Sequence, residues 1–125
     1  MPKGESLYHK VPGYRVDLEP SGKRIRVRFG DTLVADSART LTVLESKHEP
    51  VTYFPREDVD FTALERTEHE SFCPFKGDAS YWSLRAGDVT SENSVWSYED
   101  PFPEVSGLKG YVAFYADRVT WQREP

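Results

Sequence analysis

The sequence is short of cysteine, of long apolar runs and of positive charge, and each shortage excludes a class of protein. The single cysteine, Cys73, excludes an internal disulfide and a zinc site built from several cysteines. No apolar run approaches membrane-spanning length, and the apolar core of a signal peptide is missing from the N-terminal residues MPKGESLYHK. The net charge of −5 argues against a nucleic-acid partner. We therefore expect a reduced, cytoplasmic protein that binds neither nucleic acid nor membranes.

The composition is that of a folded protein with many rings. Hydrophobic residues make up 38% and charged residues 30% of the 125 positions, which predicts one globular domain over residues 1–125. Prolines and glycines interrupt residues 1–20, so we expect an extended lead-in there. Aromatic residues reach 14%, and such residues either fill β-rich cores or line concave sites.

Alternation of apolar and polar residues predicts strands along most of the chain. The pattern is clearest over 24–36, where arginines alternate with apolar residues and Gly30-Asp31 forms a hairpin turn. Further strands are expected over 38–45, 51–54, 79–85, 94–98, 109–115 and 119–122, with a turn at Ser91-Glu92-Asn93 and short helical turns. The predicted fold is therefore mainly β, either a sandwich or a partly open barrel.

Three arginines, Arg24, Arg26 and Arg28, share one face of the predicted hairpin. A strand with one wet face has this pattern, in which case carboxylates should balance the arginines. The alternative is a phosphate-binding wall, because the guanidinium group matches phosphate geometry.

Four segments together resemble a known family. They are VADSARTLTVLE, VTYFPREDVD, SFCPFKGDASYWSLR and SVWSYEDPFPEVSGLKGYVAFYADRVTW, and they cover about Lys23 to Gln122. The family is a bacterial one of unknown function, domain-of-unknown-function family 427, which has also carried a nucleotidyltransferase label. The Cys-Pro-x-Lys-Gly turn and the later Trp-x-Tyr and Phe-Tyr pairs are its most specific features here.

The resemblance implies a β-tent fold, similar to that of methionine-R-sulfoxide reductases and of several small zinc proteins. Those relatives fix two turns with paired Cys-x-x-Cys knuckles, which this chain lacks, so no structural zinc follows. Reductase activity does not follow either, because function depends on the site and not on the fold.

The turn Cys73-Pro74-Phe75-Lys76-Gly77 is the first candidate site. Pro74 favours an extended Cys73, and Gly77 permits a positive φ where the chain reverses. Cys73 and Lys76 should then lie close together, and a neighbouring ammonium favours the thiolate, which makes Cys73 a candidate catalytic nucleophile. Lys76 is a candidate for holding a phosphate or carboxylate. The alternatives are a small buried cysteine and a surface lysine.

Rings on the strands after this turn supply the rest of the predicted site. Tyr81, Trp96, Tyr98, Tyr111 and Tyr115 carry polar tips that can reach a ligand, although alternation must send about half of the rings into the core. With Lys76, Gly77 and Arg56 they form the predicted ligand-binding set.

Metal chemistry has weaker support in the sequence. Asp58 and Asp60 have the spacing that puts two carboxylates on one face of a strand, as two-metal nucleotidyl transfer requires. That reaction also normally needs a glycine-rich phosphate loop opening a helix, which the sequence does not contain. His69 lies four residues before Cys73, but two ligands make a poor zinc site. We predict no metal site and leave the cofactor unknown.

Three functions remain open. The first is a small-molecule pocket, formed by the Cys73–Gly77 turn and the aromatic strands, for an anionic or aromatic metabolite; the sequence does not say whether it catalyses a reaction. The second is a non-catalytic interaction module with an aromatic protein-binding or homodimer surface. The third is the magnesium-dependent nucleotidyltransferase of the family label, with Asp58 and Asp60 as metal ligands.

Overall fold

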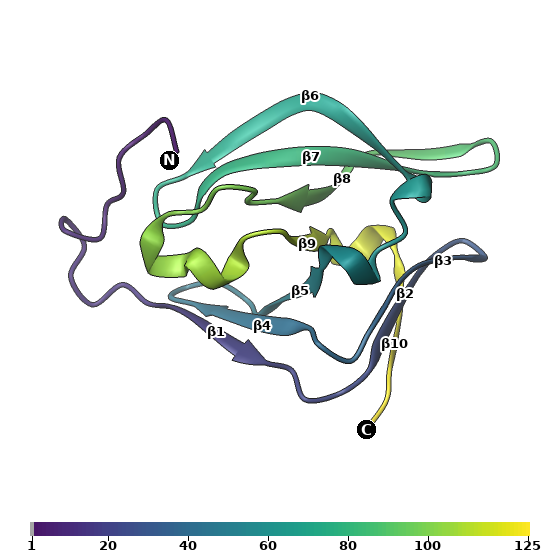
Figure 1. Cartoon of the computed structure of the whole chain (residues 1–125), viewed down its shortest axis with the longest axis horizontal. Helices are drawn as coiled ribbons and strands as arrows, with labels where there is room; N and C mark the ends of the chain where they lie inside the picture. The colour runs from purple at the N-terminus through teal and green to yellow at the C-terminus, as the bar shows by residue number, and fades with distance from the viewer. Residues whose placement is uncertain (1) are drawn as a thin grey trace.

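The computed structural model describes residues 2–125, which form ten strands joined by turns and short 3-10 helices (Figure 1). The strands are β1 (Val16–Pro20), β2 (Ile25–Phe29), β3 (Thr32–Ser37), β4 (Leu41–Glu45), β5 (Val51–Pro55), β6 (Leu64–Cys73), β7 (Gly77–Ala86), β8 (Val89–Ser97), β9 (Tyr111–Phe114) and β10 (Thr120–Arg123). The 3-10 helices are η1 (Arg56–Asp58), η2 (Phe61–Ala63), η3 (Pro103–Leu108) and η4 (Ala116–Arg118). No helix within the described residues is long and apolar enough to cross a bilayer.

The strands form two antiparallel sheets. Seven strands make a large sheet in the order β1-β4-β5-β9-β8-β7-β6, and three make a small sheet in the order β10-β2-β3. β1 and β6 are the edges of the large sheet, so it does not close into a barrel. The small sheet lies at one end of the large sheet, below the arch of the β6–β7 hairpin (Figure 1). The predicted mainly-β fold in one small domain is confirmed, with open sheets.

Side-chain alternation gives the large sheet two different apolar faces. Phe54 and Trp82 belong to a core that includes residues of the small sheet, whereas the preceding residues, Tyr53 and Tyr81, belong to a second cluster. The first core is formed by Ile25, Val27, Phe29, Val34, Ala35, Phe54, Val59, Ala63, Trp82, Leu84, Val95, Val112 and Phe114. Packing within this first core joins the small sheet to the large sheet.

The second cluster packs the segment around η3 against the other face. It is formed by Val43, Tyr53, Ala79, Tyr81, Tyr98, Phe102, Val105, Leu108 and Ala113. In Figure 1 the η3 segment runs across the front of the large sheet, near the end where β6 and β7 meet. The tyrosines of this cluster are the structural basis of the candidate site.

Irregular pairing bends the strands at two neighbouring points. The register shifts between Arg66 and Glu70 where β6 pairs with β7, and between Trp82 and Leu84 where β7 pairs with β8. Asn93 has φ 50° there, and its side-chain oxygen accepts a hydrogen bond from Thr67 Oγ1 at 2.6 Å. The predicted turn at 91–93 is therefore wrong. These residues form a bulge inside β8, and the strand continues on both sides of it.

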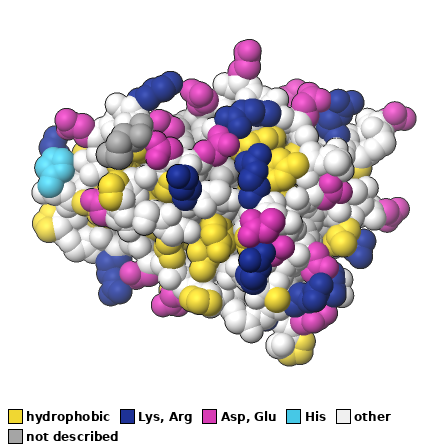
Figure 2. Space-filling model, viewed as in Figure 1, with side chains coloured by type: hydrophobic (Ala, Val, Ile, Leu, Met, Phe, Trp, Pro, Cys, Tyr) yellow, Lys and Arg dark blue, Asp and Glu magenta, His cyan; other side chains and the backbone are white. Residues whose placement is uncertain are grey.

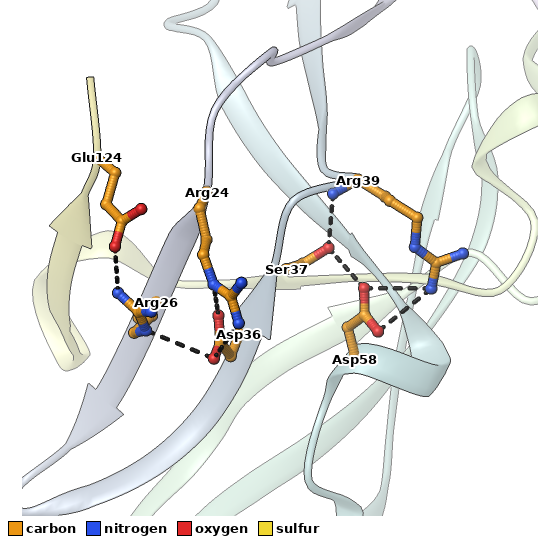
Figure 3. A network of polar contacts seen from close by, with 7 residues as sticks. All are labelled: Arg24, Arg26, Asp36, Ser37, Arg39, Asp58 and Glu124. Atoms are coloured by element: carbon orange, nitrogen blue, oxygen red, sulfur yellow. Dashed lines mark hydrogen bonds and ion pairs between the residues drawn. The ribbon is translucent and has the colours of Figure 1, made fainter.

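Carboxylates balance two of the three arginines, Arg24 and Arg26, on this face of the β2–β3 hairpin (Figure 3). Arg24 Nε donates to Asp36 Oδ1 at 2.8 Å, and Arg26 lies 3.4 Å from Asp36 Oδ2 and 2.7 Å from Glu124 Oε1. These contacts favour the solvated-face interpretation over the phosphate wall. Figure 2 likewise shows acidic and basic side chains interspersed on the face it displays.

Replacing Phe54 by alanine should test the contact between the sheets. Phe54 is fully buried, and its ring contacts those of Phe114 and Trp121. Removing it leaves a cavity, so we expect the free energy of unfolding in urea to fall by about 3–5 kcal/mol. Val89→Ala, at a site 61% exposed, should change it by less than about 0.5 kcal/mol. Equal effects of the two substitutions would contradict this description of the core.

Candidate functional site

A hollow of about 670 Å³ opens on the η3 side of the large sheet. Its wall combines the Cys73–Lys76 turn with residues of β4, β5, β7, β8 and the loops beside them. The lining residues are Tyr14, Val43, Glu45, His48, Glu49, Val51, Tyr53, Phe72, Cys73, Pro74, Phe75, Lys76, Tyr81, Trp96, Tyr98 and Tyr115. Half of the lining residues are thus aromatic and a few are charged, which is a common make-up of a small-molecule site.

The tight turn that ends β6 brings Cys73 and Lys76 to this wall. Cys73 pairs with Gly77 across the β6–β7 hairpin, and the amide of Lys76 donates to the carbonyl of Cys73 at 3.2 Å. Gly77 has φ 122°, and a side chain there would meet Pro2 and Pro101. Glycine is thus required both for the backbone conformation and for the close approach of these prolines.

The Lys76 side chain is mostly buried and is paired at the wall of the hollow. Its ammonium contacts Glu45 Oε1, and the side chains of Lys76 and Glu45 are only 10% and 8% exposed. The other carboxylate oxygen, Oε2, accepts a hydrogen bond from the Tyr14 hydroxyl and lies 3.7 Å from His48 Nε2. Lys76 Nζ also lies 5.9 Å from the centre of the Tyr98 ring. The wall therefore contains a buried ion pair whose acid is held from two sides.

The phenols around this pair differ in whether their hydroxyls are already bonded. Trp96 Nε1 donates to the Tyr53 hydroxyl at 3.1 Å, and the Tyr81 hydroxyl lies 2.9 Å from Ser71 Oγ. No hydrogen-bond partner for the Tyr98 hydroxyl occurs within residues 2–125. Burial raises the pKa of Tyr53 and of Tyr98, so both phenols stay protonated at neutral pH and can donate.

The N-terminal lead-in crosses the turn and supplies part of the wall. The Tyr14 ring stacks on Phe75 with 3.7 Å between ring centres, and the Tyr8 ring meets the same ring edge-on at 5.2 Å. The amide of Leu7 donates to the carbonyl of Pro74 at 3.0 Å. The pKa of the Tyr14 phenol is raised, mainly by desolvation and to a lesser extent by the hydrogen bond to Glu45.

The structure brings most of the predicted site residues to the hollow. Six of them line it: Cys73, Lys76, Tyr81, Trp96, Tyr98 and Tyr115. Gly77 supports the turn from behind, and Tyr111 and Arg56 do not line the hollow. Sequence reasoning missed Glu45, Tyr14, His48 and Tyr53. For Glu45 and Tyr53, the period-two pattern of β4 and β5 could have shown which face of the sheet each side chain takes. It could not have shown which strands become neighbours.

A family model described as "Domain of unknown function (DUF427)" matches residues 17–124. The chain belongs to this family. The match spans most of the chain and agrees with the resemblance seen in the sequence. The name of the model carries a nucleotidyltransferase label, which by itself describes no reaction of this chain. No protein with a curated description matches the chain.

The stretch that matches DUF427 starts at Asp17, so most of the lead-in, up to residue 16, lies outside it. Most of the hollow belongs to the DUF427 domain, but Tyr14 comes from the lead-in. The extra segment is attached to the site turn by the Phe75 stack and by the Leu7–Pro74 hydrogen bond. Part of the site wall in this chain is therefore not contributed by the family domain.

The Asp-x-Asp pair of the DUF427 domain lies in a charged turn, and both carboxylates already have partners within the chain. Asp58 ends η1 and accepts hydrogen bonds from Ser37 Oγ at 2.6 Å and from Arg39 at 3.2 Å (Figure 3). Asp60 instead caps η2 by accepting from the amide of Thr62 at 3.0 Å. The helical turn η1 begins directly after Pro55, which ends β5 because it cannot donate to the sheet. Residues 2–125 contain no group of three or more metal-ligating side chains arranged for a metal ion.

Arg56 belongs to a separate surface cluster of the DUF427 domain. Its guanidinium lies 4.1 Å from the centre of the Phe61 ring and 3.7 Å from Glu99 Oε2. Arg66 Nη2 donates to Glu99 Oε1 at 2.8 Å and stacks over Trp82. The cluster covers the edge of the first core.

This cluster predicts a specific loss of stability in acid. Hydrogen bonds from Arg66 hold the pKa of Glu99 below its ordinary value of 4.5. A lowered pKa means that the stabilisation is present above about pH 4.5 and is lost as the pH falls through the depressed value. We expect Glu99→Gln to flatten the fall in urea stability of the protein between about pH 5 and pH 3. Glu68→Gln, on the exposed side of β6, is the control; equal flattening by both variants would contradict the assignment.

Proposed function

We propose that the hollow binds a small metabolite that carries an aromatic ring. The observation that carries this proposal is that four rings with polar tips, Tyr53, Tyr81, Trp96 and Tyr98, surround one hollow beside a buried ion pair. Stacking against such rings selects planar molecules, and the phenols offer hydrogen bonds at their edges.

The charges around the hollow favour a ring over a simple anion. Lys76, the cation expected to hold a phosphate or carboxylate, is already paired with Glu45. Glu49 adds a second carboxylate to the lining. An anionic group on the ligand would have to compete with Glu45 for the ammonium, whereas a ring needs no such exchange.

The Tyr98 hydroxyl is the best donor to a ligand. It faces the hollow, it stays protonated, and no side chain of residues 2–125 takes its hydrogen bond.

Two other rings of the lining, Phe72 and Tyr115, are 43% and 44% exposed. Such exposed rings also suit the alternative of a homodimer or protein contact, in which a second chain covers the same hollow.

A thermal-shift screen should distinguish these cases. The panel contains neutral ring compounds (adenosine, indole, nicotinamide), a ring with a carboxylate (4-hydroxybenzoate) and anions without a ring (succinate, phosphate). We expect ring compounds to raise the melting temperature because they bind only the folded state. Stabilisation by succinate and phosphate alone would contradict the proposal, and stabilisation by Mg²⁺ with nucleoside triphosphates alone would favour nucleotidyl transfer.

Tyr98→Phe tests the donor with the ring retained. We expect the Kd of the best ring compound to rise about twofold to tenfold, which corresponds to the loss of one hydrogen bond of about 0.5–1.5 kcal/mol. Tyr111→Phe is the matched control, because Tyr111 lies outside the hollow, and its Kd should equal that of the wild type. Calorimetric titration measures both. If a concentration-dependent dimer masks the site, sedimentation will show the dimer and support the homodimer alternative instead.

A further inference from the structure

Lys76 and Glu45 form an ion pair whose side chains are only 10% and 8% exposed. Taking an ammonium out of water is unfavourable, and a buried ion pair is often no more stable than apolar residues of the same size. Stability therefore does not account for a lysine at this position. Buried lysines that border a cavity are the ones that proteins use as nucleophiles.

The turn does not need the lysine side chain for its shape. The Lys76 amide donates to Cys73, and the Lys76 carbonyl accepts from the amide of Phe102 at 3.0 Å. Both bonds use the backbone, and the stack of Tyr14 on Phe75 adds a contact that is independent of the amine. The shape of the turn therefore does not require a lysine, whose amine instead contacts Glu45 at the wall of the hollow.

An amine nucleophile requires a proton acceptor and a neighbouring surface that holds the ligand, and the surroundings of the Lys76 amine provide both. Glu45 Oε1 contacts Nζ directly and can take its proton. Tyr14 and His48 hold the other oxygen of Glu45, so the acceptor is kept in place. The Tyr98 ring lies on another side of the amine, at 5.9 Å, and belongs to the same wall as the rings proposed to hold the ligand.

We infer that Lys76 forms an imine with a ring-bearing aldehyde or ketone bound in the hollow. This inference rests on the proposed function, because the rings must hold the carbonyl compound next to Nζ. It adds the substrate class, a carbonyl attached to an aromatic ring, and a covalent step.

The step balances with the groups present. The ammonium of Lys76 transfers a proton to Glu45 Oε1, and the freed nitrogen lone pair attacks the carbonyl carbon to form a carbon–nitrogen bond. One proton from Glu45 and one from the attacking nitrogen pass to the carbonyl oxygen, which leaves as water. The nitrogen keeps its third proton, so the product is a protonated imine. The remaining bond between carbon and nitrogen becomes double. No oxidant or reductant is consumed, and hydrolysis by water reverses each stage.

Reductive trapping with benzaldehyde tests this inference on the wild-type protein. The folded protein is incubated at neutral pH with benzaldehyde and sodium cyanoborohydride, which reduces imines to stable benzylamines. Peptide mass spectrometry then gives the rate of labelling at each lysine. We expect Lys76 to be labelled at least about tenfold faster than the exposed Lys23, because the hollow holds the reactants together.

A purely structural ion pair predicts the opposite order. A buried, protonated amine would be labelled more slowly than exposed lysines, so equal or slower labelling at Lys76 would overturn the inference. Lys76→Arg keeps the positive charge but cannot form an imine, and it should remove the fast label. Lys23→Arg should leave the label at Lys76 unchanged.

Benzamide, which has the ring but no reactive carbonyl, separates the failure of this inference from that of the proposed function. If benzamide stabilises the protein in the thermal-shift assay while Lys76 stays unlabelled, the hollow binds rings and the imine inference fails. If neither benzamide nor the ring compounds of the panel stabilise the protein and Lys76 stays unlabelled, both proposals fail. Slowing of the Lys76 label by benzamide, with no change at Lys23, supports both.

Discussion

Side-chain alternation along the large sheet is the constraint on which both the core and the hollow depend. Phe54 and Trp82 point to the face that the small sheet covers, and their neighbours Tyr53 and Tyr81 point to the face that carries the hollow. A slip of one residue in a strand would exchange the two sets. The rings with polar tips are thus held over the site by the same pairing that buries the purely apolar ones.

The Lys76–Glu45 pair joins parts of the chain that are far apart in the sequence. Glu45 ends β4, Lys76 belongs to the turn after β6, and Tyr14 reaches the same carboxylate from the lead-in. Breaking a buried pair by removing one partner typically costs about 3–5 kcal/mol, although the intact pair contributes little net stability. A pair of this kind fixes where groups lie more than it stabilises the fold, which suits a site wall.

The sequence predicted the positions of the strands more completely than the residues of the candidate site. Alternation over 24–36 located the β2–β3 hairpin, and the Cys73–Gly77 turn correctly brought Cys73 and Lys76 to one wall. Alternation reports which face a residue takes but not which strands lie side by side. Glu45, 31 residues from Lys76, was therefore missed. The bulge at Asn93 was misread because its turn-like residues look the same inside a strand as between strands.

The ion pairs of the structure differ in how far they are exposed to solvent. Arg24 and Arg26 pair with Asp36, Arg39 pairs with Asp58, and Arg66 pairs with Glu99, all at the surface. Pairs exposed to solvent contribute little energy, and they leave these guanidiniums already engaged by carboxylates. The Lys76 ammonium is engaged as well, by Glu45, but this pair is buried and borders the hollow. Solvent screens the charges of a buried pair less than those of exposed pairs, so the charges in this wall act more strongly on neighbouring groups than those of the surface arginines do.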